Sequence, residues 1–185
     1  DAPGYNISTP LPEDKPGALG YARALGRFLD TIGVRPAVMI GHSLGAMMAG
    51  AYAAEVNPDV PALILGDPAN GYGEAPPEIR EQKLQHRLEM VRDLGPEGMA
   101  EMRSGNLLSD TPPSEAVEMV KWNMRKTTLL GYEQASYALA DGHLMGRAGE
   151  FRGKALVLCG GEDNVTPVDA CREVAAAYND ARFDV

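Results

Sequence analysis

A chain of 185 residues with 44% apolar side chains can bury one sizeable core, and its length is typical of one domain with room for an insertion. Acidic residues outnumber basic ones by 26 to 17, and the formal charge of −9 argues against nucleic acid or an anionic membrane as a partner. No apolar run is long enough to cross a bilayer. The two cysteines, Cys159 and Cys171, form no disulfide framework, so we expect reduced thiols in a cytoplasmic protein.

The first third of the chain has the pattern of an α/β unit. Four prolines predict a loop over residues 1–17, and apolar residues at helical spacing predict a helix over 17–31. A short apolar run ending at Ile40 predicts a strand, which a helix over 44–56 and a second strand over 60–65 follow. Strand, helix and strand at this spacing indicate a right-handed parallel crossover, so the predicted fold class is α/β.

The middle of the chain has a different composition. Residues 70–147 contain few β-branched side chains, and strong breakers such as Gly95-Pro96 separate several helical stretches. We therefore expect a helical cap inserted between two parts of the core, residues 1–69 and 148–185. The remaining predicted elements are cap helices over 77–94, 98–103, 114–127 and 132–141, then a strand over 155–159, a helix over 167–178 and the start of a strand at 182–185.

The motif Gly41-His42-Ser43-Leu44-Gly45 lies between the first strand and the second helix. In this context Gly-x-Ser-x-Gly is typical of a nucleophile elbow, in which a strained turn exposes the serine at the end of the strand. We expect neighbouring backbone to lie so close to positions 41 and 45 that neither position has room for a side chain. The N–H of Leu44 is the predicted oxyanion donor. The alternative is a Gly/Ser-rich turn between a buried strand and a packed helix.

A candidate acid, Asp163, follows the strand at 155–159, where a carboxylate would project from the same sheet edge as Ser43. The elbow together with the segment 160–167 resembles the α/β-hydrolase superfamily, in which the catalytic order is Ser, Asp or Glu, His. Residues 1–8 resemble the loop after the fourth strand of that fold. The resemblance implies a mostly parallel sheet with flanking helices and a helical cap, incomplete at both ends in this chain.

Parts of the predicted cap are similar to one group within that superfamily. The segments 99–102, 131–135 and 138–141 resemble the cap of 3-oxoadipate enol-lactonase-like enzymes. The resemblance implies hydrolysis of a small anionic lactone. Because helical caps diverge freely, this match says less about the substrate than the elbow says about the fold.

The sequence does not identify the catalytic base, the histidine of the Ser, Asp or Glu, His order. His42, His86 and His143 all precede Asp163, whereas the resemblance places the base after the strand that follows the acid. We expect a supporting structural role for His42 and a solvated side chain for His86, with a pocket role open for His143. The resemblance therefore implies a fragment of a longer hydrolase, with the histidine beyond Val185 and an oxyanion loop before residue 1.

Two other carboxylates compete with Asp163 for the role of the acid. Glu162 is its neighbour, but adjacent residues in a turn point in different directions. Asp67 follows the second strand, at a site where some relatives of this fold carry the acid. It is also a good turn former before Pro68.

Aromatic and sulfur-containing residues of the predicted cap are candidates for the substrate pocket, although such residues on helices usually form core. Arg125 is a candidate contact for an anionic substrate, with plain solvent exposure as its alternative. No Cys/His cluster has metal-ligand spacing and no Gly-rich phosphate loop is present, so we expect neither a metal nor a cofactor. The candidate substrate-binding residues are Trp122, Met124 and Tyr137, with Tyr72 as a further one.

These residues predict a serine hydrolase that cleaves a small ester or lactone through an acyl-enzyme, with Ser43 as nucleophile and Asp163 orienting the base. A carbon–carbon bond hydrolase acting on a vinylogous diketone uses the same constellation and remains an alternative. A ligand-binding protein without catalysis on the same fold is a second alternative. The expected partner is a small molecule, and the oligomeric state stays open.

Overall fold

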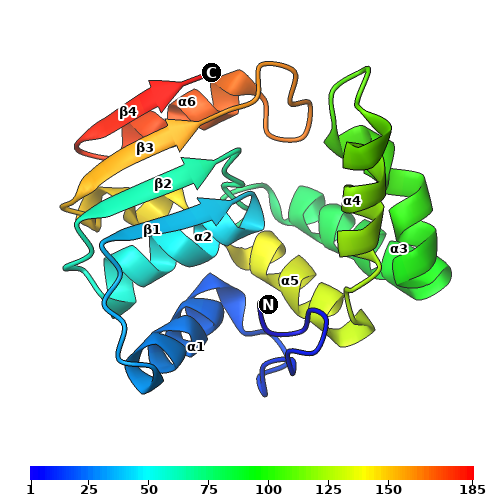
Figure 1. Cartoon of the computed structure of the whole chain (residues 1–185), viewed down its shortest axis with the longest axis horizontal. Helices are drawn as coiled ribbons and strands as arrows, with labels where there is room; N and C mark the ends of the chain where they lie inside the picture. Colours follow the sequence, from blue (N-terminus) through cyan, green and yellow to red (C-terminus); the bar gives the residue numbers. More distant parts are fainter.

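The computed structural model describes all of residues 1–185 and contains one four-stranded sheet. Its strands are parallel and follow one another in space in chain order, as Figure 1 shows. Their carboxyl ends therefore meet at one edge of the sheet, which is where parallel α/β sheets carry their sites. The strands are β1 (Val38–His42), β2 (Ala62–Gly66), β3 (Lys154–Leu158) and β4 (Ala181–Asp184).

Three helices flank the sheet, and three more form an arm beyond its carboxyl edge (Figure 1). The helices predicted from the sequence are present with ends that agree within a few residues. The last turns of the predicted helix over 44–56 are a π-helical segment, η1 (Tyr52–Val56). The flanking helices are α1 (Gly17–Thr31), α2 (Leu44–Ala51) and α6 (Val168–Ala177), and the arm contains α3 (Pro77–Arg103), α4 (Ser114–Met124) and α5 (Leu129–Asp141).

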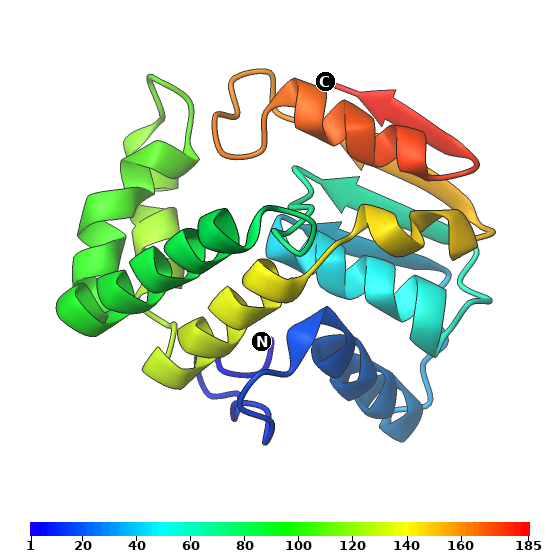
Figure 2. The ribbon, with the colours of Figure 1, turned by 180° about the vertical axis from the view of Figure 1, so that it is seen from behind.

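The main core lies on the face of the sheet that the helices cover. This face is turned toward the viewer in Figure 2, which is rotated by 180° from Figure 1. Strand residues alternate between the two faces, so Leu63, Leu65 and Val157 point toward α2 and α6 and are fully buried. Met47 of α2 and Cys171 of α6 pack against them. Burial of each such side chain stabilises the fold by about 1.5–3 kcal/mol.

The opposite face of the sheet has no helix over it in this chain (Figure 1). Ile40 is 69% exposed there, and Val38 and Leu158 are exposed as well. An apolar sheet face open to water is unusual for a parallel sheet, whose two faces are normally both covered.

Helix α3 is broken within its length. Gly95 has φ 62° and ψ 179°, and Pro96 follows it, so the helix changes direction between its two parts. This is the break that the sequence predicts between the helices over 77–94 and 98–103. Helix α3 packs against both α4 and α5. The short 3₁₀ segments at Ser104–Leu107 and Met145–Glu150 are not predicted by the periodicity.

Candidate active site

Ser43 stands between the carboxyl end of β1 and the first residue of α2. Its backbone has φ 52° and ψ −121°, a conformation that costs a non-glycine residue free energy and is typical of a nucleophile elbow. The N–H of Ser43 donates to Gly66 O at 2.9 Å, and Ser43 O accepts from Ala46 N at 3.0 Å and from Ala69 N at 3.2 Å. Bonds to both neighbouring segments hold the strained turn in place.

The two glycines of the motif have different roles in the structure. A Cβ on Gly41 would overlap the carbonyl oxygen of Gly45 and the Cα of Ala46, as the sequence predicts. The same prediction for Gly45 is wrong, because a Cβ there would point into open space and Gly45 has an ordinary φ. The close approach is thus made by the backbone of Gly45 onto Gly41, and only Gly41 has to lack a side chain.

The N–H of Leu44, the predicted oxyanion donor, opens helix α2 and has no hydrogen-bond acceptor within the protein. The first N–H groups of a helix lack intrahelical partners, and the positive end of the helix dipole lies among them. This N–H follows directly on Ser43, so it is available to an anionic oxygen formed beside the serine.

Asp163 lies in the loop after β3, and three hydrogen bonds fix its carboxylate. Oδ1 accepts from Val165 N at 2.6 Å and from Thr166 N at 2.9 Å, and Oδ2 accepts from Thr166 Oγ1 at 2.7 Å. Burial raises the pKa of this carboxyl, but the donors of Thr166 and Val165 lower it by more, so the pKa of Asp163 lies below its usual value. Asp163 is therefore ionised and oriented at neutral pH.

The competing carboxylates occupy other positions. Asp67 Oδ1 accepts from Gly160 N at 2.8 Å, which links the loop after β2 to the loop after β3. Asp67 Oδ2 also lies 3.5 Å from His42 Nε2. Glu162 is exposed and has no side-chain hydrogen bond within the protein. These contacts give Asp67 a role in joining loops, and they leave Asp163 as the carboxylate with an organised shell of donors.

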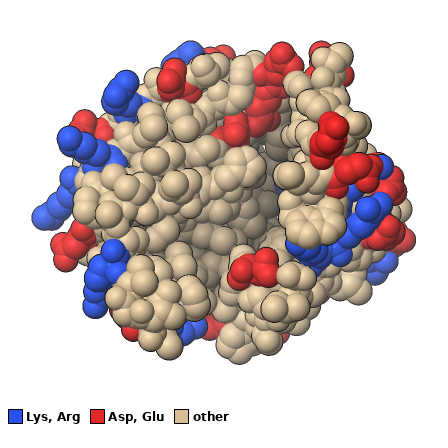
Figure 3. Space-filling view, in the orientation of Figure 1, with Lys and Arg blue, Asp and Glu red and all other residues tan.

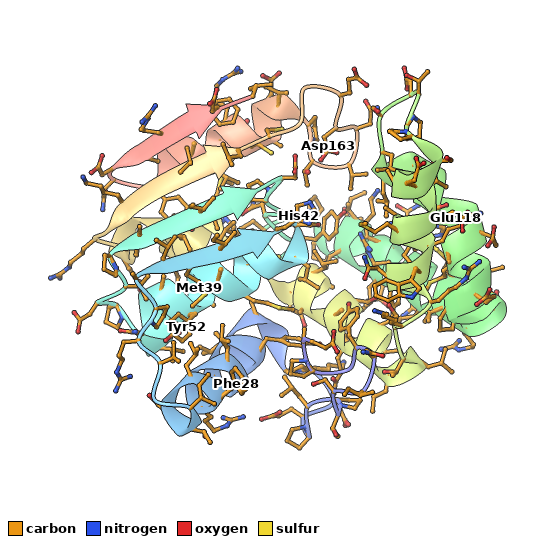
Figure 4. The ribbon with its side chains drawn as sticks, in the orientation of Figure 1. Phe28, Met39, His42, Tyr52, Glu118 and Asp163 are labelled. Carbon is orange, nitrogen blue, oxygen red and sulfur yellow. The ribbon has the colours of Figure 1, made fainter.

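The three histidines lie apart from one another. His42 points away from the core with 74% of its side chain exposed, and Figure 4 shows it at the same edge of the sheet as Asp163. The only polar contact of its side chain within the protein is the one with Asp67. His86 is exposed on α3, as predicted. His143 lies 3.6 Å from Glu74 and lines a separate cavity of about 230 Å³ behind α2.

A cavity of about 420 Å³ opens beside Ser43, between the sheet edge and the arm. Figure 3 shows a hollow in the molecular surface between the sheet and the arm. The loops after β1 and β2 and the start of α6 form one side of the cavity, and residues of α3, such as Met99, form the other. Two of the sequence candidates, Met124 and Tyr72, line this cavity.

The structure corrects the pocket prediction for Trp122 and Tyr137, neither of which lines the Ser43 cavity. Trp122 is 58% exposed on α4, and Lys126 Nζ lies over its ring at 2.8 Å from the centroid. Tyr137 packs against the buried residues of α3 and α5, with Lys15 over its outer face. Helical spacing identifies aromatic residues but does not tell which face of the helix meets the cavity.

Arg125, the proposed contact for an anion, is paired with acidic side chains of α3. Its Nε lies 2.8 Å from Glu97, and its second nitrogen donates to Glu101 at 2.6 Å. Arg87 and Arg103, which are not predicted from the sequence, do line the cavity together with Tyr5 and Tyr132. On a charged helix such as α3 these arginines look like ordinary solvent-facing residues, and the break at Gly95 gives no sequence signal for where they point.

A family model described as alpha/beta hydrolase fold matches residues 1–185. The chain belongs to this family. Among solved structures, this α/β-hydrolase is similar to a thermophilic esterase from Thermogutta terrifontis, with a TM-score of 0.85 and 24% identity over 100% of this chain and 68% of that one. The enol-lactonase from Burkholderia xenovorans superposes with a TM-score of 0.82 and 20% identity, over 100% of this chain and 70% of that one. The fold predicted from Ser43 and Asp163 is thereby confirmed.

Curated relatives of this α/β-hydrolase include a 2-hydroxy-6-oxo-6-phenylhexa-2,4-dienoate hydrolase from Comamonas testosteroni. It is 27% identical over 195 residues, which cover 100% of this chain and 66% of that protein. The chain thus spans just under two thirds of the length of the curated relatives it matches.

No helix in the structure combines the length and the hydrophobicity that a membrane crossing requires.

Proposed function

We propose that this α/β-hydrolase is a serine hydrolase that cleaves a small ester or lactone through an acyl-enzyme. The observation that carries the proposal is the placement of Ser43 on a strained elbow, beside the unpaired N–H of Leu44 and at the wall of a cavity of about 420 Å³. A volume of this size is within the range of small-molecule pockets.

In the proposed reaction, Ser43 Oγ attacks the carbonyl carbon of the substrate while its proton passes to a histidine. The carbonyl electrons move onto oxygen, where the Leu44 N–H donates to the oxyanion. The bond to the leaving oxygen then breaks, and the histidine returns the proton to that oxygen. Water hydrolyses the acyl-enzyme by the same route, and neither a metal nor a cofactor takes part.

Asp163 is the proposed acid that orients the histidine, since its carboxylate is ionised and held by Thr166 and Val165. The base itself is proposed from the family order Ser, Asp, His, which places it after β4. The three histidines of these 185 residues precede Asp163 and occupy the other positions described above.

A carbon–carbon bond hydrolase is the second candidate function. The observation in its favour is the names of three curated relatives. Two at 26–27% identity are named 2-hydroxy-6-oxo-6-phenylhexa-2,4-dienoate hydrolase, and one at 23% is named 2-hydroxy-6-oxononadienedioate/2-hydroxy-6-oxononatrienedioate hydrolase. The same nucleophile, oxyanion donor and acid serve this reaction, with a carbon leaving group in place of an alkoxide. Product analysis with an ester, a lactone and a vinylogous diketone separates the candidates.

A fluorophosphonate probe tests the proposal on the full-length gene product that contains this chain. We expect a covalent adduct on Ser43, located by peptide mass spectrometry, and no adduct there in Ser43→Ala. In Asp163→Asn the rate of turnover is expected to fall about a thousandfold or more, because the base loses its oriented partner.

The matched control is Ser114→Ala, an exposed serine on α4, which should label at Ser43 like the wild type. Folded protein that gives no adduct on Ser43 would contradict the serine-hydrolase proposal and favour a ligand-binding protein on this fold.

A further inference from the structure

Two arginines face the Ser43 cavity from one broken helix. Arg87 lies in the first part of α3 and Arg103 is its last residue, on opposite sides of the break at Gly95. A straight helix would carry these residues about 24 Å apart along its axis at 1.5 Å per residue. The change of direction at Gly95 allows both parts of α3 to contribute to a single cavity.

These two arginines are the only charged residues that line the cavity. The chain has 26 acidic residues and a formal charge of −9, yet none of its carboxylates lies in this wall. The cavity is therefore a cationic site within an acidic protein, and its charge is opposite to that of the molecule as a whole.

Neither guanidinium group forms an ion pair within the protein. Other arginines of the arm, such as Arg80 and Arg125, have carboxylate partners, whereas Arg87 and Arg103 have none within 4.0 Å. Arg103 donates to the hydroxyl of Tyr132 at 2.8 Å, which fixes its direction without neutralising its charge. Taking a charge out of water is costly unless it has a partner, so two partly buried arginines without a carboxylate partner in one cavity favour an anionic ligand.

Tyr5 adds a hydroxyl group to the lining of the same cavity. Its ring reaches the cavity from the N-terminal loop, and its hydroxyl has no hydrogen-bond partner in the protein. Burial raises the pKa of Tyr5, and the positive charge of Arg87 partly opposes that shift. The Tyr5 hydroxyl stays protonated at neutral pH and is available as a donor.

We propose that Arg87 and Arg103 bind a carboxylate of the substrate, so that the enzyme acts on carbonyl compounds that carry a carboxylate away from the reacting carbonyl. This inference rests on the proposed function and names the substrate class for it. Each guanidinium presents a planar fork of N–H donors that matches the two oxygens of a carboxylate. The carboxylate anchors one end of the substrate on α3 while the carbonyl lies at Ser43.

Two esters with the same six-carbon acyl chain test the proposal, mono-4-nitrophenyl adipate and 4-nitrophenyl hexanoate. Hydrolysis by the full-length gene product is measured above the background of Ser43→Ala. We expect the wild type to favour the adipate ester, and Arg87→Gln and Arg103→Gln to lower the ratio of kcat/KM, adipate over hexanoate, by about 10- to 100-fold each.

The matched control is Arg92→Gln, which removes the same charge from an exposed position of α3 outside the cavity. It should leave the adipate-to-hexanoate ratio as in the wild type. A wild-type enzyme that hydrolyses both esters equally, or a ratio that falls as much in Arg92→Gln as in Arg87→Gln, would overturn the carboxylate site.

Calorimetric titration of Ser43→Ala with adipate separates this proposal from the hydrolase proposal. Binding that is lost in Ser43→Ala/Arg87→Gln and kept in Ser43→Ala/Arg92→Gln supports the carboxylate site even if neither ester is cleaved. If the esters are cleaved and adipate does not bind, the carboxylate site is wrong and the serine hydrolase stands.

Discussion

At the scale of single residues, the elbow depends on one serine in a strained conformation and one glycine in close contact. Ser43 keeps a positive φ because its N–H and C=O are bonded to Gly66, Ala46 and Ala69. Gly41 lies directly against the backbone of the first turn of α2. The strain is held by the surrounding structure, which is how functional sites keep unfavourable backbone conformations.

Alanine at the two motif glycines should therefore have opposite effects. Gly41→Ala is expected to lower the free energy of unfolding by about 2–3 kcal/mol, because backbone must move to admit the Cβ. Gly45→Ala is expected to be neutral or to raise it by up to about 1 kcal/mol, since the Cβ meets open space and alanine favours a helix. Urea unfolding followed by circular dichroism measures both, and equal losses would contradict the structural account.

At the scale of elements, helix α5 holds the N-terminal loop in place through the buried side chain of Gln134. Gln134 is 1% exposed, and its amide oxygen accepts from Leu11 N at 3.2 Å. Its amide nitrogen donates to Leu11 O and to Glu13 O, both at 2.8 Å. The loop brings Tyr5 to the cavity, so this helix–loop attachment also shapes the candidate site.

Removing the amide of Gln134 should loosen that attachment. Gln134→Leu keeps the volume but removes the partner of the Leu11 N–H and of the Leu11 and Glu13 carbonyl oxygens, of which the two groups of Leu11 are buried. We expect a loss of about 2–4 kcal/mol in the free energy of unfolding. Gln85→Leu is the control, because Gln85 is exposed on α3 and bonds only to Glu81. Its effect should stay within about 0.5 kcal/mol. If the two variants unfold at the same urea concentration, the anchoring role of Gln134 is wrong.

At the scale of the whole molecule, the sheet separates two unlike surfaces. One face is covered by helices (Figures 1 and 2) and forms the core. The other face presents Val38, Ile40 and Leu158 to water. An exposed apolar face of this kind favours association. Charge is distributed unevenly as well, because the acidic molecule has a cavity whose only charged groups are two arginines.

Polar substitutions on the open sheet face should reduce self-association of the 185-residue chain. Threonine at Val38 and Ile40 keeps the β-branched shape, so we expect a change of no more than about 0.5 kcal/mol in stability. Binding of the dye ANS and the associated fraction in sedimentation velocity should both fall in the double variant. Unchanged association would mean that another surface is responsible. Leu63→Thr on the buried face is the contrasting variant and should unfold the chain readily.

Much of this architecture follows from local sequence patterns. The break before Pro96, the strand–turn–helix around Ser43 and the loop position of Asp163 all depend on neighbouring residues, and the structure has them where the patterns predict. The parallel pairing of β1 with β2 also follows, because a short connection through a helix joins them. The pairing of β2 with β3 joins strands separated by the whole arm and is seen only in the tertiary structure. The roles of Ser43, Leu44 and Asp163 in catalysis, and the division into core and cap, stay predictions.

The lining of the cavity was decided only by the tertiary structure. Trp122 and Arg87 both lie on helices of the arm, yet Trp122 is exposed to solvent and Arg87 lines the cavity beside Ser43. The face that a helix turns to a cavity depends on the angle at Gly95 and on packing between α3 and α5, which join residues distant in sequence. Local sequence patterns thus determined the strand–turn–helix setting of Ser43, whereas long-range packing decided which charged residues line the cavity beside it.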